Sequence, residues 1–550
     1  MAISEEEAKL ERFLEWLQVN GAELRGCNIK YSDSRKGFGI FASSSSTQAS
    51  DDVLLVVPLD LAITPMRVLQ DPLLGPECQK MFQQGQVDDR FLMILFLTLE
   101  RLRINSSWKP YLDMLPTRFG NPLWFSDVDI LELKGTNLYH ATELQKKKLM
   151  SLYHEKVEPL VKQLLILDGD SQSEVSSEHF LWANSVFWSR ALNIPLPHSF
   201  VFPQSQEDVG EYLSTNIQAQ VPGATSLGPG DTVWVEGLVP GIDFCNHDLK
   251  PAATWEVDGT GLVSSVPFSM YLLSVAQQCI PNKEVSISYG NKGNEELLYL
   301  YGFVIENNPD DYLMVHYPVE AIPSIPFSDT KGQLLEAQKA QLRCLLPKSA
   351  LNHGFFPQTT SKIRESDEKE TVRYCSFSWS GQRKMPSYMN KLVFPEDFMT
   401  GLRTIAMQEE EIYKVSAMLE EKLVESRPDE QPSETEVRMA IWEACGDSGA
   451  FQLLVDLLNA KYAIEFVTRD LILRAKMMKL EENSGTEEQD ARLLEEACCD
   501  EEPRDWDGRR MSRNKWSSVV YRRGQKQLTR LFLKEAEHAL HLALSSSDHH

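Results

Sequence analysis

Two tyrosines, Tyr289 and Tyr301, stand on either side of a short turn within the segment 289–303. The turn consists of small and polar residues, and a helix-compatible stretch then leads to Tyr301, Gly302 and Phe303. Two phenols held in this way predict a narrow aromatic channel with its hydroxyl groups directed inward. Such a channel suits a reaction on an amine, because removal of water favours the neutral, nucleophilic form of the amine.

Local structure must deliver these side chains to one place. The alternating run 285–288 predicts a strand that ends at Tyr289. About 40 residues upstream lies a second segment with polar groups suited to binding, Pro240-Gly241-Ile242-Asp243-Phe244-Cys245-Asn246-His247. We expect the two segments to meet in the fold.

Two further motifs precede these segments. A glycine-containing stretch, 36–42, reads Lys-Gly-Phe-Gly-Ile-Phe-Ala, and Ser189-Arg190-Ala191 carries an isolated arginine. The four motifs, in this order and with a long insert between the first two, resemble the SET-domain protein methyltransferases of the Rubisco large-subunit methyltransferase branch. The motifs cover roughly residues 20–320, and the remainder of the chain resembles the family in its helical architecture.

The resemblance implies a protein-lysine N-methyltransferase that uses S-adenosylmethionine and acts on a non-histone protein. Methyl transfer from this cofactor needs no metal and no covalent intermediate, so positioning and exclusion of water carry most of the catalysis. A good near-attack geometry supplies roughly 7–11 kcal/mol. A lysine amine, whose ordinary pKa is about 10.4, must first lose its proton. A closed aromatic channel favours this neutral form.

The resemblance also implies roles for single residues. Tyr289 is the expected catalytic residue, whose hydroxyl orients the attacking amine. A strong general base is not expected here, because a free tyrosine titrates near pH 10. The expected cofactor-binding residues are Lys36, Phe38, Arg190, Asn246, His247 and Phe303. The expected substrate-binding residues are Asp243, Trp255 and Tyr301.

Residue chemistry agrees with these implied roles. Arg190 is a fixed cation that suits a carboxylate, and an asparagine such as Asn246 supplies both a donor and an acceptor to a zwitterion. The glycines around Phe38 allow close approach of the backbone to a ligand. Lys36 departs from the acidic residue that some members of the family carry.

Two other functions stay open. Protein-histidine N-methylation occurs in one branch of the family, although Tyr301 in Tyr-Leu-Tyr-Gly-Phe resembles the lysine-type pattern. A catalytically silent SET fold that serves as a binding scaffold is the third reading. The complete set of motifs argues against that third reading, since a degenerate site would have lost Tyr289 or the Asn-His pair.

Composition limits the partners. The 550 residues carry a formal net charge of −25, and no basic patch offsets it, so direct binding of nucleic acid is disfavoured. The longest apolar run, 91–97, is shorter than the roughly 20 residues of a membrane span. The start of the sequence shows no secretory or transit signal, so we expect the protein in the cytoplasm or nucleus, and a plastid location stays open. We separately expect a monomer.

Cysteine usage argues against a structural metal. The nine cysteines are scattered and contain no Cys-x-x-Cys pair, which leaves no ligand set for zinc and indicates reduced thiols. The only partner we expect is a protein substrate that presents a lysine side chain.

The predicted fold class is α+β: a β-rich SET domain interrupted by a helical insert and followed by an all-α domain. We assign residues 1–67 to an N-terminal helix and the first part of the SET domain, 68–188 to the insert, and 189–324 to the second, catalytic part. Residues 325–550 form the predicted helical substrate-binding-like domain. Its expected helices span 333–346, 396–424, 435–459 and 525–544.

Three stretches are predicted as loops. Residues 43–50 and 205–232 are rich in small or polar residues. Residues 481–505, part of a predicted acidic loop near 481–515, hold eleven acidic residues and two arginines. A solvated loop is the simpler interpretation of this acidity, and attraction to a basic protein substrate is the alternative.

Overall fold

The computed structural model divides the chain into two compact units, one of residues 1–119 with 148–291 and one of residues 120–147 with 292–550. The described residues are 5–33, 36–43, 52–85, 87–170, 173–201, 232–259, 268–275, 280–317, 319–340, 342–344, 394–426, 431–462, 484–498 and 511–547. The predicted loops at 43–50 and 205–232 lie almost entirely outside these ranges. The domain boundaries predicted from the sequence stay predictions.

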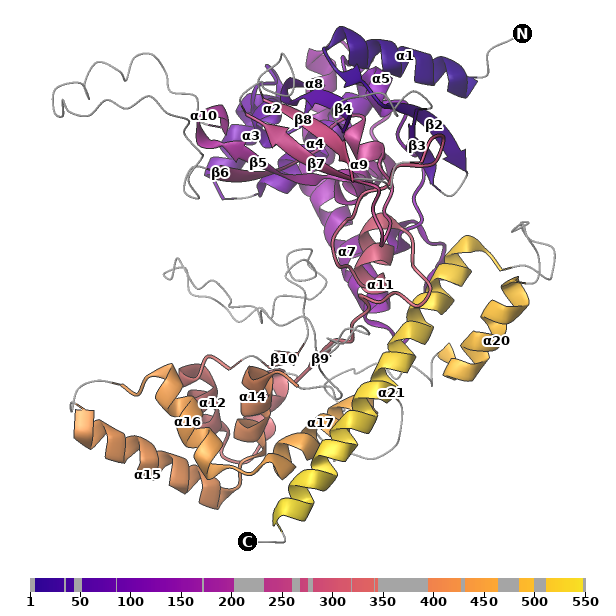
Figure 1. The fold of residues 1–550 in the computed structure, drawn as a ribbon. Coiled ribbons are helices and arrows are strands. Elements are labelled where there is room, and N and C mark those ends of the chain that lie inside the picture. Colours follow the sequence, from indigo (N-terminus) through magenta and orange to yellow (C-terminus); the bar gives the residue numbers. More distant parts are fainter. Residues whose placement is uncertain are drawn as a thin grey trace, which may run out of the picture. The chain divides into compact units, whose positions relative to one another are not determined.

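The first unit is built on a four-stranded antiparallel sheet in the order β1-β4-β8-β7 (Figure 1). Its strands are β1 (Glu23–Leu24), β4 (Val53–Pro58), β8 (Ser269–Ser274) and β7 (Ala253–Asp258). All of β4 is buried, as its uninterrupted apolar sequence predicts. Two antiparallel pairs are the other strands of this unit among the described residues: β2 (Cys27–Asp33) with β3 (Gly37–Ala42), and β5 (Leu192–Pro197) with β6 (Thr232–Gly237).

Two helices of the first unit, α4 (Asp89–Leu102) and α9 (Ser177–Arg190), begin at side chains that cap their first turn. In α4 the Asp88 carboxylate caps the start by accepting from the Phe91 N–H at 2.9 Å, and the apolar run 91–97 is wholly buried. Helix α9 begins with a capping box and ends at Arg190, which places that cation at a helix end. The other helices are α1 (Glu5–Val19), α2 (Pro65–Leu69), α3 (Leu74–Gln83), α5 (Lys109–Leu112), α8 (Glu158–Leu167) and α10 (His198–Val201).

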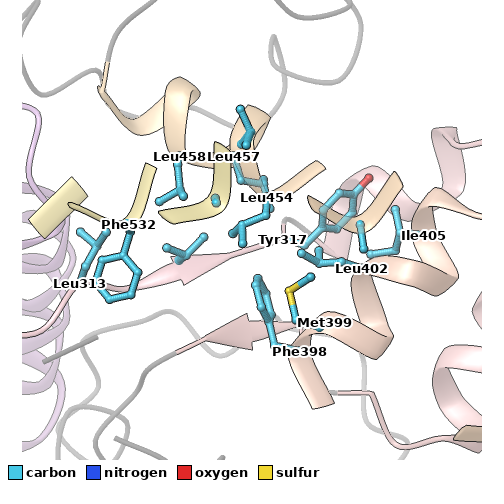
Figure 2. Packing of buried hydrophobic residues seen from close by; sticks show 14 of the residues in the cluster. Leu313, Tyr317, Phe398, Met399, Leu402, Ile405, Leu454, Leu457, Leu458 and Phe532 are labelled. Carbon is cyan, nitrogen blue, oxygen red and sulfur yellow. The ribbon is translucent and has the colours of Figure 1, made fainter. Parts of the chain in front are cut away.

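The second unit is mainly helical and packs around the C-terminal helix α21 (Arg513–Ser547). Its core brings together Leu313, from the segment before β9, with Phe398, Leu454 and Phe532, from three separate helices (Figure 2). Helix α21 packs along α17 (Asp447–Tyr462) and α20 (Glu487–Cys498) (Figure 1). The remaining elements are α6 (Asp127–Leu131), α11 (Asn294–Glu296), α12 (Ser328–Ala337), α14 (Glu396–Ala406), α15 (Glu409–Ser426), α16 (Glu434–Ala444), β9 (Val315–His316) and β10 (Arg343–Cys344). Helix α7 (Asn137–Leu152) contains the boundary at 147/148.

All four expected C-terminal helices have different bounds. The expected helix 525–544 is part of the longer α21, which begins at Arg513. The prediction of one helix over 396–424 is wrong, because the backbone leaves the helical region at Met407, with ψ at 136°. The Gln408 N–H then donates to the Glu411 carboxylate at 2.8 Å and starts α15. The expected helix 435–459 is likewise divided between α16 and α17, and the expected helix 333–346 ends at Ala337, before the short strand β10.

The prediction of an acidic loop is wrong for residues 487–498, which form helix α20. Basic side chains of α21 neutralise the acidic ones and so remove the repulsion that favours a loop. The ion pairs are Arg523–Glu487 at 2.9 Å, Arg530–Glu488 at 2.7 Å, Arg522–Asp490 at 2.7 Å and Lys526–Asp490 at 2.6 Å. Residues 499–510 of the acidic stretch lie outside the described part of the chain.

The prediction of an α+β chain with a helical C-terminal region is confirmed by this arrangement of strands and helices. Among the described helices, none has the length and hydropathy of a membrane span.

Candidate active site

The segment that ends at Tyr289 runs beside the segment that contains Asn246 and His247. The Ile287 N–H donates to the Asn246 carbonyl at 2.9 Å, and the Asp248 N–H donates to the Ile287 carbonyl at 3.1 Å. Together they form a parallel bridge between His247 and Ile287. Two of the predicted motifs, separated by about 40 residues, are therefore joined through their backbones.

This pairing places Tyr289 against His247. The Tyr289 N–H donates to His247 Nδ1 at 3.1 Å, and the two ring centroids lie 5.2 Å apart at an interplanar angle of 37°. Because a backbone N–H can only donate, Nδ1 is the unprotonated nitrogen of the imidazole. His247 is thus the neutral tautomer with its proton on Nε2.

The Tyr289 hydroxyl is held by the same segment. It donates to the carbonyl oxygen of Cys245 at 2.8 Å. Burial raises the pKa of Tyr289 well above its ordinary value, and the nearby charge of Arg190 only partly opposes this. The phenol therefore stays protonated at neutral pH, and with its proton on Cys245 it acts toward another group as an acceptor. This is the behaviour of an orienting residue rather than of a general base.

Asp243, a buried residue of the same segment as Asn246 and His247, pairs with the half-buried Arg190 at the end of α9. The Arg190 guanidinium donates to the Asp243 carbonyl at 2.8 Å and lies 3.5 Å from its carboxylate. The Tyr111 hydroxyl donates to the same carboxylate at 2.6 Å, and the Gly241 N–H does so at 3.2 Å. Burial raises the pKa of Asp243, and the positive charge of Arg190 opposes that effect. The two residues, predicted on opposite sides of the reaction, are direct partners here.

A second polar cluster joins Asn246 to the N-terminal glycine motif through Glu284. The Asn246 amide donates to one carboxylate oxygen of Glu284 at 2.6 Å, and Lys36 Nζ pairs with the other at 2.5 Å. A Cβ on Gly39 would lie 2.8 Å from this carboxylate, so the glycine allows β3 to approach it closely. Phe38, on the same strand, is buried and contacts Tyr31 edge to face at 5.5 Å.

Sequence reasoning missed Tyr111 and Glu284. Tyr111 lies in a short helix of the predicted insert, where nothing in the local pattern separates it from other core aromatics. Glu284 had one available signal, its position directly before the strand that delivers Tyr289. Trp255, predicted on the substrate side, is half-buried on β7, where its backbone pairs with Leu272 of β8. Its contact with substrate stays a prediction.

Tyr301 and Phe303 belong to the second unit. A π-helical turn, Leu297–Tyr301, ends at Gly302, whose left-handed backbone has φ 77°. The two aromatic rings on either side of this glycine lie 6.3 Å apart, edge to face. Lys292 Nζ lies 5.9 Å from the centre of the Tyr301 ring and pairs with Glu296 at 3.4 Å.

Buried hydrogen bonds of Asn294 hold the start of α11, the helix that leads into this turn. The Asn294 N–H donates to Asp311 at 2.6 Å, and its side chain exchanges two hydrogen bonds with the backbone of Ile305, at 2.9 and 2.8 Å. Sequence reasoning named the Asn-Glu-Leu residues only as neighbours of Tyr289. Within the described residues, no three His, Cys, Asp or Glu side chains gather as a metal ion would require.

Comparison with known proteins gives the fold. No family model matches the chain. Over 350 residues it is 27% identical to the ribosomal lysine N-methyltransferase set10 of Schizosaccharomyces pombe, a match that covers 62% of this chain and 54% of that protein. Over 348 residues it is 23% identical to the actin-histidine N-methyltransferase of Rhinolophus ferrumequinum, covering 62% and 48%. The chain thus spans about half the length of these curated relatives.

A solved structure of Rubisco LSMT bound to sinefungin and monomethyllysine is similar over 98% of this chain and 92% of its own, with a TM-score of 0.59 and 19% identity. This chain has the SET-domain fold of Rubisco LSMT. The predicted resemblance is therefore confirmed for the fold. In this SET fold, the Tyr289 and His247 segments pair within the first unit, and the Tyr301 turn lies in the second.

Proposed function

We propose that this chain is an S-adenosylmethionine-dependent protein-lysine N-methyltransferase that acts on a non-histone protein. The observation that carries the proposal is the Tyr289 hydroxyl, held by the Cys245 carbonyl with a raised pKa beside the Asn246-His247 pair. A neutral phenol in this position accepts a hydrogen bond from an amine and so fixes the direction of its lone pair.

The residues of the site fit S-adenosylmethionine. Arg190 supplies a cation for the carboxylate of its methionine part. The Asn246 amide nitrogen donates to Glu284, which leaves the amide oxygen as the group that accepts from an ammonium. His247 carries its ring proton on Nε2, because Nδ1 accepts from the Tyr289 N–H. When bound, the cofactor supplies an electrophilic methyl group.

The chain's own residues then have three tasks. Arg190, Asn246 and His247 bind and orient the cofactor, with Lys36, Phe38 and Phe303 as further predicted contacts. Tyr289 orients the amine. Tyr301, Asp243 and Trp255 are the predicted substrate side, where exclusion of water keeps the amine neutral. The buried pairing of Asp243 with Arg190 gives Asp243 a part in holding this cation, in addition to the predicted role.

Lysine is the preferred target over histidine. The Tyr-Leu-Tyr-Gly-Phe pattern around Tyr301 and the lysine-directed relative support this choice, and the relative that acts on actin histidine supports the alternative. The predicted cellular location, the monomeric state and the identity of the substrate protein belong to this proposal.

Two measurements on the full chain test the function. Calorimetric titration with S-adenosylmethionine should show saturable one-to-one binding, and absence of binding contradicts both the lysine and the histidine enzyme. Peptide mass spectrometry of a protein methylated by the chain should locate the added group on lysine. Methylation found only on histidine would replace the lysine assignment with the alternative.

A further inference from the structure

We propose that Arg513 and Tyr521, at the start of α21, position the Tyr301 turn for methyl transfer. This inference rests on the proposed function, because it assigns a catalytic consequence to a contact far from Tyr301 in the sequence. Every contact that supports it lies within the second unit, and neither residue belongs to the four sequence motifs.

The first support is a hydrogen bond from Tyr521 to Glu295. The Tyr521 hydroxyl donates to the Glu295 carboxylate at 2.6 Å, and both residues are about 1% exposed. Glu295 lies in α11, which continues directly into the π-helical turn Leu297–Tyr301. The buried carboxylate is therefore a fixed point at the start of the turn.

The second support reaches the other end of the turn. The Arg513 guanidinium donates to the carbonyl oxygen of Gly302 at 3.3 Å. A Cβ on Gly302 would lie 2.8 to 2.9 Å from backbone atoms of Gly120 and Asn121, and a Cβ on Gly120 would lie 2.5 Å from the Gly302 carbonyl oxygen. Gly302 thus packs closely against the backbone of Gly120 and Asn121, and its carbonyl accepts from Arg513.

Helix α21 is itself held firmly enough to act as a support. Arg522 pairs with Asp490 at 2.7 Å and with Glu132 at 2.6 Å, and Lys526 pairs with Asp490 at 2.6 Å. Buried, hydrogen-bonded pairs of this kind allow little movement, since breaking one leaves an uncompensated charge. Because the helix is fixed, the residues near its start, Arg513 and Tyr521, are also held in place.

The consequence falls on two predicted site residues. Tyr301 and Phe303 flank Gly302, so a displacement of its carbonyl moves both rings. A misplacement of about 1 Å can cost on the order of 100-fold in rate. Arg513 and Tyr521 touch neither cofactor nor substrate in this proposal, and they act through the turn.

The variants Tyr521→Phe and Arg513→Gln, alone and combined, test the inference, with Arg530→Gln as the control because Arg530 pairs with Glu487 and Glu488 on α20. In the double variant we expect kcat/KM for the protein substrate to fall by about 10- to 100-fold. The ratio of mono- to higher-methylated product should also change. Arg513→Lys, which keeps a cationic donor, should recover part of the loss.

Amide hydrogen exchange of residues 294–303 gives a readout that does not depend on activity. Exchange should be about tenfold faster in the double variant, as expected from the loss of hydrogen bonds to a charged group, and unchanged in Arg530→Gln. Exchange and product ratios equal to those of the control would overturn the inference. If exchange responds while the unmodified chain neither binds S-adenosylmethionine nor transfers a methyl group, the support stands but the catalytic consequence and the proposed function both fail.

Discussion

Three candidate site residues of the first unit, Tyr289, His247 and Asn246, are each held by a hydrogen bond whose donor and acceptor are fixed. His247 accepts from the Tyr289 backbone, Tyr289 donates to Cys245, and the Asn246 amide donates to Glu284. These bonds fix the orientation of the three side chains. Preorganisation of this kind removes the cost of turning polar groups at the moment of reaction.

At this scale the Gly39→Ala variant is the sharpest test of the cofactor side. The new Cβ would lie 2.8 Å from the Glu284 carboxylate and 3.2 Å from the Asn246 amide nitrogen, so we expect it to displace the carboxylate and weaken the hydrogen bond between the two groups. Losing a hydrogen bond to a charged group costs about 1.5–3 kcal/mol, so we expect calorimetry to show a Kd for S-adenosylmethionine raised about tenfold or more.

Gly332→Ala is the matched control, because a Cβ at Gly332 of α12 meets none of the described atoms within 4 Å. Its Kd should equal that of the unmodified chain. An unchanged Kd in Gly39→Ala would show that the Asn246–Glu284 pair has no part in cofactor binding.

The sequence predicted this part of the site as far as local patterns reach. The strand before Tyr289 and the turn with Asn246-His247 each carry a local signal, and the structure joins them. Tyr111 carries no such signal, and Glu284 has only its position before the strand, because one acid among 80 acidic residues gives no indication of which distant amide it meets. Tertiary pairing, rather than spacing along the chain, selects them.

At the scale of elements, α20 shows how a charge pattern changes meaning in the fold. Its acidic residues repel one another in isolation, which is why the sequence predicts a solvated loop. The basic side chains that compensate them lie on α21, in a separate stretch of sequence. The sequence does not predict the helix ends at Met407 and Ala444 either. The amphipathic pattern continues past both residues, although the backbone leaves the helix there.

Acid should loosen the contact between α20 and α21. Burial alone would raise the pKa of Glu487, but hydrogen bonds from Arg523 and Gln527 outweigh it, and the pKa is lowered. Burial also raises the pKa of Glu132, but hydrogen bonds from Arg522 and Lys515 outweigh this effect, and the pKa is lowered. A carboxylate with a lowered pKa in the folded state stabilises the fold above its unfolded pKa and loses this effect as the pH falls.

We therefore expect the free energy of unfolding, measured with urea, to decline as the pH falls below about 4. The decline should be shallower in the double variant Glu132→Gln/Glu487→Gln. The exposed Glu410→Gln serves as control and should leave the slope unchanged. Equal slopes in all three proteins would remove these carboxylates from the acid response.

At the scale of the whole molecule, each compact unit is assembled from two separated stretches of sequence. Residues 120–147 join the C-terminal half, and residues 148–291 join the N-terminal part. Composition and periodicity divide a chain into consecutive pieces, so they give no signal for such an exchange of segments. The α+β class was predictable because strand and helix patterns are local and strong in 53–57, 91–97 and the C-terminal helices.

We propose for the whole molecule that this chain transfers a methyl group from S-adenosylmethionine directly to a protein lysine whose amine Tyr289 orients. The most direct test of this proposal is incubation of the full chain with isotope-labelled S-adenosylmethionine and a cell lysate, beside Tyr289→Phe and the exposed Tyr413→Phe as control. We predict lysine labelling by the unmodified chain and by Tyr413→Phe. Tyr289→Phe should bind the cofactor and lose transfer by about 100-fold, the scale of a misoriented nucleophile. Equal labelling by Tyr289→Phe, or no labelling by the unmodified chain, would contradict the account.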